Sequence, residues 1–142
     1  MVEKIKALAK QYAPALIDIR RHLHAHPELS YQEFETSKFI QQELKKLGIP
    51  FEIKATTGVV GMIEGKNPGK RVIALRADID ALPINEENDV PYKSQNEGVM
   101  HACGHDVHTS CLLGAARILN DLKSEWEGTV KLVFQPGEEK NP

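Results

Sequence analysis

The 142-residue chain has few cysteines, few aromatic residues, little net charge and no long apolar run. Two cysteines are too few for a disulfide scaffold, so in a reducing compartment each thiol serves packing, catalysis or metal binding. The net charge of -2, with scattered lysines and arginines, predicts that the protein binds neither nucleic acid nor an anionic membrane. Because no segment resembles a signal peptide or a membrane span, we expect a cytoplasmic protein with small-molecule partners.

Apolar residues make up 41% of the sequence and charged residues 27%, which is typical of one ordinary globular domain with its own core. Apolar positions recur at helical spacing and predict three helices, over residues 3–24, 34–47 and 106–122. Ser30 and Glu33 fit a capping box at the start of the second helix. Cys111 belongs to the apolar stripe of the third helix, so we expect this thiol to pack in the core.

Short apolar segments bounded by turn residues predict four strands, over residues 51–55, 58–64, 71–77 and 129–134. The third strand, the third helix and the fourth strand resemble an α/β crossover. If the two strands are parallel, their carboxyl ends meet in one crevice, where open α/β sheets bind ligands. Residues 78–104 show no clear periodicity, and a loop of that length is usually functional or holds short elements.

The segment HACGHDVH, residues 101–108, concentrates three histidines, a thiol and a carboxylate. Either His101 or His108 alone reads as an ordinary structural residue. Cys103 and His105 lie two residues apart with Gly104 between them, so their side chains can bind one metal ion. Their place just before a predicted helix also favours the thiolate, because the helix dipole stabilises negative charge there.

Two adjacent carboxylates, Glu138 and Glu139, follow the last predicted strand in the sequence FQPGEE. Alone, the pair could be solvated loop charge. Beside a metal-binding thiol and imidazole, however, one acid could bind the cation and the other could shuttle a proton, the two roles that metallohydrolases need.

A second pair of acids, Asp78 and Asp80, ends the third strand in the sequence LRADIDALP. A structural alternative is that one or both of them cap the turn. A carboxylate at this place can also hydrogen-bond an imidazole ligand and fix its tautomer, and we assign that supporting role to Asp78 rather than Asp80. Arg76 is expected to form ion pairs with these acids.

These motifs together resemble one known family. RRHLHAHPELSYQEFET, LRADIDALP, MHACGHDVHTSCLLGAARIL and FQPGEE, in this order and spacing, resemble the N-acyl-amino-acid amidohydrolases, metallopeptidases that include aminoacylases, hippurate hydrolases and plant auxin-conjugate hydrolases. The resemblance covers almost the whole chain. It implies an α/β catalytic domain of the zinc-aminopeptidase (phosphorylase/hydrolase-like) type, a three-layer sandwich with a mixed central sheet.

The same resemblance implies a site with two divalent ions, zinc or manganese, with nickel or cobalt also possible. Its metal ligands would be Cys103, which would bridge the ions, His105 and Glu139. Glu138 would be the general base, and Asp78 would have a supporting role. A metal-activated water would then cleave the amide bond of an N-acyl amino acid or a small peptide such as a dipeptide.

Family members are more than twice as long as this chain and supply further histidine ligands beyond it. Residues 1–142 therefore correspond to the N-terminal portion of the catalytic domain. The rest of that domain and the lid domain that supports dimerisation would be missing, and the full-length protein would be a homo-oligomer. We expect the truncated chain to have little activity and to expose a sheet edge and bare apolar surface.

Two other hypotheses for the function stay open. Cys103 could be the nucleophile of a metal-free amidase, with His105 or His108 as its base, although the paired glutamates would then have no task. The chain could also be a non-catalytic fragment or interaction module. The acyl group and the amino acid of the substrate do not follow from these residues.

Overall fold

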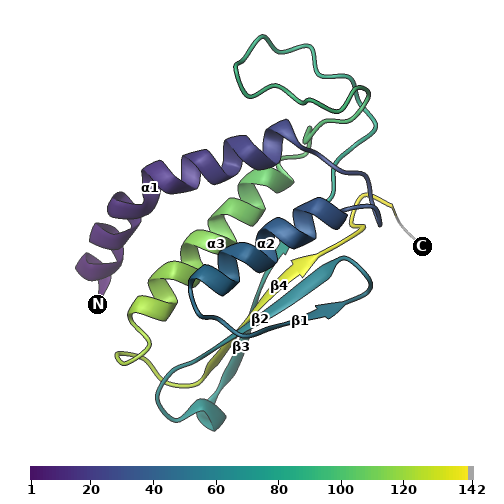
Figure 1. The fold of residues 1–142 in the computed structure, drawn as a ribbon. Coiled ribbons are helices and arrows are strands. Elements are labelled where there is room, and N and C mark those ends of the chain that lie inside the picture. Colours follow the sequence, from purple (N-terminus) through teal and green to yellow (C-terminus); the bar gives the residue numbers. More distant parts are fainter. Residues whose placement is uncertain (141–142) are drawn as a thin grey trace.

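The computed structural model describes residues 1–140, which form helices packed on a sheet (Figure 1). The elements, in chain order, are α1 (Val2–Ala25), α2 (Phe34–Lys46), β1 (Phe51–Lys54), β2 (Gly58–Glu64), the short 3-10 helix η1 (Pro68–Lys70), β3 (Val72–Asp78), α3 (His105–Asp121) and β4 (Thr129–Gln135). The three helices and four strands predicted from the sequence are confirmed to within one or two residues at their ends. Among the described residues, no helix combines the length and the hydropathy needed to cross a bilayer.

The four strands form one mixed sheet in the order β1-β2-β4-β3. β1 pairs with β2 and β2 with β4 in antiparallel fashion, whereas β3 and β4 are parallel neighbours. The crossover from β3 through α3 to β4 is therefore confirmed. Its register pairs Asp78 with Gln135, so the two strands end side by side at one edge of the sheet.

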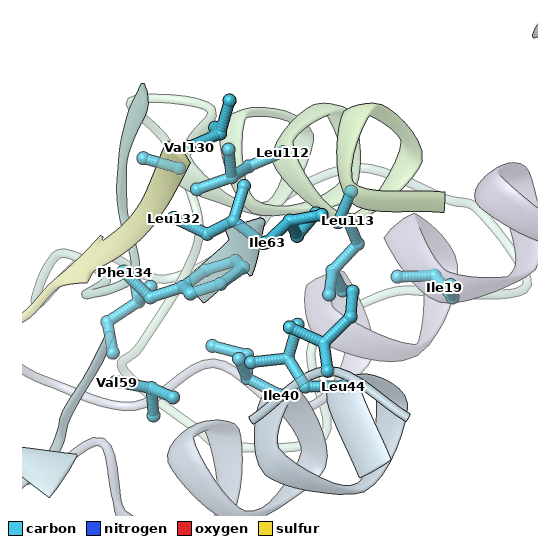
Figure 2. Packing of buried hydrophobic residues seen from close by; sticks show 14 of the residues in the cluster. Ile19, Ile40, Leu44, Val59, Ile63, Leu112, Leu113, Val130, Leu132 and Phe134 are labelled. Carbon is cyan, nitrogen blue, oxygen red and sulfur yellow. The ribbon is translucent and has the colours of Figure 1, made fainter. Parts of the chain in front are cut away.

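The hydrophobic core lies between the helices and one face of the sheet (Figure 2). Alternate residues of β4 face this core, because successive side chains of a strand point to opposite faces. Leu132, Leu113 and Ile40 are fully buried and represent the sheet, α3 and α2 in this layer. α1 packs along α3 and adds Ile19 and Leu23 at the margin of the same core.

The opposite face of the sheet carries no helix within residues 1–140, so two of the three expected layers are present. Val72 of β3 is 60% exposed, and Met62 and Lys131 lie uncovered beside each other on the same face. β3 is also an edge strand, and its Ile73 is 44% exposed. The exposed edge and bare apolar surface expected from the sequence are thus present.

Two local expectations were wrong. Cys111 is exposed rather than packed in the core, because Leu112, Leu113 and Ala116 form the buried face of α3. The capping box is also absent at the start of α2, where the carboxylate of Glu28 accepts hydrogen bonds from the amides of Glu35 and Thr36. The side chains expected to form that box, Ser30 and Glu33, turn toward the ends of β3 and β4 instead.

Candidate metal centre

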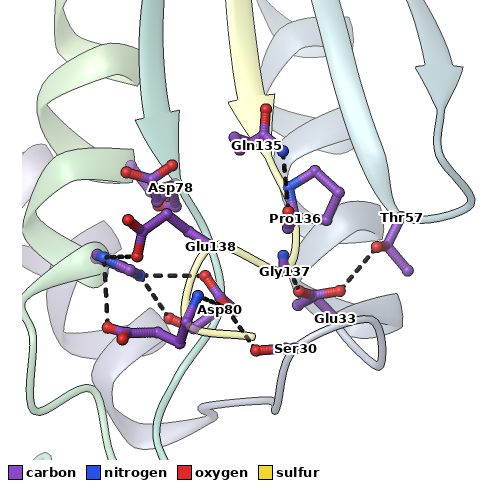
Figure 3. Close-up of polar contacts among 12 residues, drawn as sticks. Ser30, Glu33, Thr57, Asp78, Asp80, Gln135, Pro136, Gly137 and Glu138 are labelled. Carbon is purple, nitrogen blue, oxygen red and sulfur yellow. Dashed lines mark hydrogen bonds and ion pairs between the residues drawn. The ribbon is translucent and has the colours of Figure 1, made fainter. Parts of the chain in front are cut away.

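The ends of β3 and β4 and the start of α3 meet in one place (Figure 3). Asp78 is the last residue of β3, and residues 136–139, which we call the glutamate loop, follow β4 directly. His105 is the first residue of α3. The structure therefore brings the predicted site residues of the two strands and the helix to a common crevice.

Gly104 makes the bend that separates the two ligand candidates of the HACGHDVH segment. Its φ angle of 89° lies in the left-handed region, which a residue with a Cβ atom rarely adopts. The bend lets Cys103 stay at the surface while His105, only 3% exposed, enters the protein.

Cys103, His105 and Glu139 form a group of three possible metal ligands. One ligand atom of each lies within 4.8 Å of the ligand atoms of the other two. Nε2 of His105 is 3.7 Å from Oε1 of Glu139 and 3.8 Å from Oε2 of Glu138. Glu138 is the more exposed of the two glutamates, which leaves it nearer to solvent and to an approaching ligand.

The orientation of His105 is set by Asp80. Nδ1 of His105 lies 2.9 Å from the backbone oxygen of Asp80 and 3.2 Å from its Oδ1, so Nδ1 is the protonated nitrogen that donates. Nε2 faces the glutamate loop, and with the proton on Nδ1 it is the nitrogen that can donate its lone pair to a metal ion.

The sequence predicted that Asp78 would accept this hydrogen bond from His105. In the structure Asp80 accepts it, and Asp78 has other partners. It pairs with Arg76, as expected of that arginine, and its backbone oxygen accepts a hydrogen bond from Thr109. Residues 76 and 78 share one face of β3, so Asp78 stays within reach of the arginine, whereas Asp80 lies beyond the end of the strand. Asp78 is nonetheless close to the site, since it forms a second group of possible ligands with His105 and His108.

The carboxylate of Glu139 fits a cation. Its Oε1 is buried, and no hydrogen-bond donor contacts it anywhere in the part of the chain that the structure describes. A buried carboxylate oxygen without a donor is costly, and a cation shared with an imidazole and a thiolate would satisfy it. Sulfur, nitrogen and oxygen donors in one cluster form the ligand set that zinc prefers.

The pKa of the Cys103 thiol is raised above its ordinary value, against the expectation from the helix dipole. The hydrogen bond to Glu139 is the main cause, followed by burial and by the negative charges of Glu139, Glu138 and Asp78. Three carboxylates outweigh the partial positive charge of the helix end. A cation would act in the opposite direction, because it favours the thiolate.

A buried polar network behind the site was missed by the sequence interpretation. His24 of α1 lies 2.7 Å from Asp106 through Nδ1 and 2.9 Å from Glu86 through Nε2. Arg20 completes the network through an ion pair with Asp106. Asp106 is the neighbour of His105, so α1 fixes the first turn of α3. His24 and Asp106 lie in conspicuous motifs, but nothing in the sequence marks Glu86 as their partner.

Residues 101 and 108, the other two histidines of the motif, differ from each other. His101 is buried, and burial is the main reason that its pKa is lowered to about 4, so its ring is neutral near pH 7. His108 is exposed, and its ring centroid lies 5.4 Å from that of His105. The long loop before them is also ordered by the network, because Glu86 accepts a hydrogen bond from the amide of Ser94.

Comparisons with known proteins find relatives of this chain. Residues 74–142 match the model of Peptidase family M20/M25/M40. The chain is 51% identical over 98% of its length to thermostable carboxypeptidase 2 of Saccharolobus solfataricus and 47% identical over 99% to the N-acyl-L-amino acid amidohydrolase of Geobacillus stearothermophilus. It spans only 36% and 38% of these two relatives.

A solved structure shares the fold. The YXEP protein of Bacillus subtilis, described as a dinuclear metal binding peptidase from the M20 family, is 47% identical with a TM-score of 0.83. The match covers 94% of this chain and 37% of that protein. The motifs, the mixed sheet and the relatives agree, and the chain is similar to the peptidase family M20/M25/M40, whose model matches residues 74–142.

Proposed function

We propose that the chain carries part of the active site of a metal-dependent amidohydrolase that cleaves the amide bond of N-acyl amino acids or small peptides. The observation that carries the proposal is the convergence of the Cys103 thiol, the His105 imidazole and the Glu139 carboxylate within 4.8 Å at the ends of two parallel strands. Relatives named as an amidohydrolase and as a carboxypeptidase support the reaction class.

The residues divide the work as follows. Cys103, His105 and Glu139 would hold divalent ions, which when bound polarise a carbonyl and activate water. Glu138, the more exposed glutamate, would take a proton from the attacking water and pass it to the leaving amine. Asp80 keeps His105 in the ligand tautomer, and Asp78, beside His105 and His108, would support the site from the other side.

The complete site would hold two divalent ions, because the related YXEP protein is a dinuclear metal binding peptidase. Three ligands from this chain suffice for one ion, so the second needs donors from elsewhere. A thiolate favours zinc, whereas the carboxylates would also accept manganese. A thiol ligand must stay reduced, which suits a cytoplasmic enzyme.

Residues 1–142 would form the N-terminal portion of the catalytic domain of a longer, homo-oligomeric enzyme. The support is that the chain spans little more than a third of its relatives and leaves one sheet face bare. On this reading the chain alone has little or no activity. Hydrolysis of hippurate and of N-acetyl amino acids, measured for residues 1–142 and for the longer protein, should give activity only for the latter.

Cobalt binding provides a direct test on the chain itself. A thiolate bound to Co²⁺ gives a charge-transfer absorption band, so the wild-type protein should show this band. Cys103→Ser should abolish it, whereas Cys111→Ser, at the other cysteine, should leave it unchanged. Wild-type protein without the band, or a band that survives Cys103→Ser, would remove the basis of the proposal.

The metal-free cysteine amidase has weaker support. The carboxylates around Cys103 raise the pKa of its thiol, although a cysteine nucleophile needs an ionised thiolate. In the longer enzyme, a chelator should abolish activity and added divalent ion should restore it. Activity that resists the chelator and is lost on alkylation of the thiol would support the nucleophile instead.

A further inference from the structure

We propose that Glu33, with Ser30 beside it, is a positioning residue that holds the glutamate loop in the geometry for metal binding and proton transfer. The proposal rests on the proposed function for the meaning of that loop. Its starting point is the carboxylate of Glu33, which is fully buried between α2 and the loop although α2 does not use it as a cap (Figure 3).

Both oxygens of Glu33 have a defined donor. Oε1 accepts a hydrogen bond from the amide of Gly137 at 2.9 Å, and Oε2 accepts one from the hydroxyl of Thr57 at 2.7 Å. Gly137 directly precedes Glu138, so this bond fixes the Pro136–Gly137 peptide immediately before the two glutamates. Thr57 precedes β2, so Glu33 ties the loop to the sheet.

Ser30 acts on the other end of the same loop through Asp80. Its hydroxyl donates to Oδ2 of Asp80 at 2.7 Å, and the amide of Glu139 donates to the same oxygen at 2.9 Å. The other oxygen of Asp80 faces Nδ1 of His105. One short segment therefore holds the amide of Gly137 directly and, through Asp80, the amide of Glu139 and the imidazole of His105.

The shape of the loop matches this anchoring. Gly137 has a φ angle of 65°, and a Cβ atom there would clash with the ring of Tyr31. The loop thus lies directly on Tyr31, which follows Ser30 in the chain. A buried carboxylate is costly unless it is fully hydrogen-bonded, and here both of its partners serve to place the glutamate loop.

Amide hydrogen exchange and Co²⁺ affinity, measured on the chain, test the role of Glu33. Glu33→Ala removes the acceptor of the Gly137 amide, so exchange at Gly137 should accelerate about tenfold or more, as expected for loss of a hydrogen bond to a charged group. Exchange at Glu139, whose amide donates to Asp80, should accelerate less, because only the anchoring of the preceding residues is lost. Exchange in the centre of β2 and β4 should change much less. Co²⁺ should bind about tenfold more weakly, because Glu139 is no longer held beside His105.

Glu33→Gln keeps the volume of the side chain and one acceptor, so it should fold and should give a smaller change at the same two amides. The matched control is Glu43→Ala, which removes another buried carboxylate of α2 that pairs with Arg117 and Lys46, away from the loop. It should leave exchange in the loop and Co²⁺ affinity unchanged.

The outcomes separate the two proposals. Equal loop exchange in the wild type, Glu33→Ala and Glu33→Gln would overturn the positioning role, as would a Glu43→Ala variant that loosens the loop equally. If the wild type binds no Co²⁺ while the exchange pattern is as expected, the anchoring stands and the proposed metal function fails.

Discussion

The crevice at the ends of β3 and β4 and the outer surface of β3 and α3 lie next to each other but differ in how many hydrogen bonds within the chain hold their side chains in place. In the crevice, Asp80 accepts from three residues and both oxygens of Glu33 are bonded. On the outer surface, Ile73 of β3 and Cys111 of α3 are exposed, and a groove of about 490 Å³ lies between β3 and α3.

This comparison shows which parts of the fold are held by contacts within residues 1–140 alone. Hydrogen bonds between groups of this chain organise the crevice, so its geometry is present within residues 1–140. The outer surface is apolar on both β3 and α3, and apolar surface is stabilised only when something covers it. Within residues 1–140, hydrogen bonds of the chain itself therefore hold the residues at the strand ends, whereas the neighbouring surface is apolar and uncovered.

The largest expected change in the free energy of unfolding comes from comparing the covered and uncovered faces of the sheet. Leu132→Ala in the core should lower the free energy of unfolding by about 2–5 kcal/mol, because a fully buried leucine leaves a cavity. Val72→Ala, on the exposed face, should change it by less than about 0.5 kcal/mol. Urea denaturation measures both; a similar loss for the two variants would mean that the outer face is covered in solution.

A second prediction compares the two cysteines. Zn²⁺ at about 100 times its dissociation constant should raise the free energy of unfolding by about 2.7 kcal/mol. Cys103→Ser should remove most of this gain, whereas Cys111→Ser should keep it, because Cys111 lies on the uncovered face of α3. Thermal unfolding with and without zinc measures the gain, and an equal loss in both variants would refute the site.

Much of the fold could be predicted because it follows from periodicity. Helical spacing and short apolar runs gave the elements, and the β3–α3–β4 crossover followed from their order. Which face of α3 is buried could not be predicted, since α3 is apolar on more than one side. Cys111 was assigned to the core for that reason, and only packing against the sheet shows that Leu112 and Leu113 face it.

The ligand candidates could be predicted because they are dense in the sequence, but their supports could not. Cys103, His105 and Glu139 meet as expected at the strand ends. Ser30 and Glu33 satisfy the local rule for a capping box, yet their side chains serve residues about 50 and 100 positions away. A local pattern contains no information on such partners, and departures from local rules concentrate at functional sites.

A third prediction separates the two aspartates at the end of β3. Asp80→Asn should weaken metal binding about 10- to 100-fold, because the amide cannot accept from Ser30, His105 and the Glu139 backbone together. Asp78→Asn should weaken it less, since the carboxylate of Asp78 pairs mainly with Arg76. Zinc titration of the two variants decides; a larger loss for Asp78→Asn would restore the supporting role first assigned to it.

The smallest expected effect is on the pH dependence of the free energy of unfolding at acidic pH, through Glu86 in the network behind the crevice. Burial alone would raise the pKa of Glu86, but hydrogen bonds from Ser94, His24 and Asn88 and the charge of His24 outweigh it and lower the pKa to about 2. The folded protein therefore keeps Glu86 ionised between pH 4.5 and 2, where the unfolded chain takes up a proton. Stability contributed by Glu86 is complete above pH 4.5 and is lost as the pH falls toward 2.

Replacing Glu86 should consequently make the free energy of unfolding depend less on pH between pH 4.5 and 2. Glu86→Gln should be less stable than the wild type at neutral pH, with the difference shrinking between pH 4.5 and 2. The exposed neighbour provides the control, Glu87→Gln, whose curve should run parallel to that of the wild type. Urea denaturation at constant ionic strength gives the three curves. If the curves of Glu86→Gln and the wild type also run parallel, the bond between His24 and Glu86 does not tie the long loop to α1 in solution. The contacts of α1 with the crevice would then depend on the ion pair between Arg20 and Asp106.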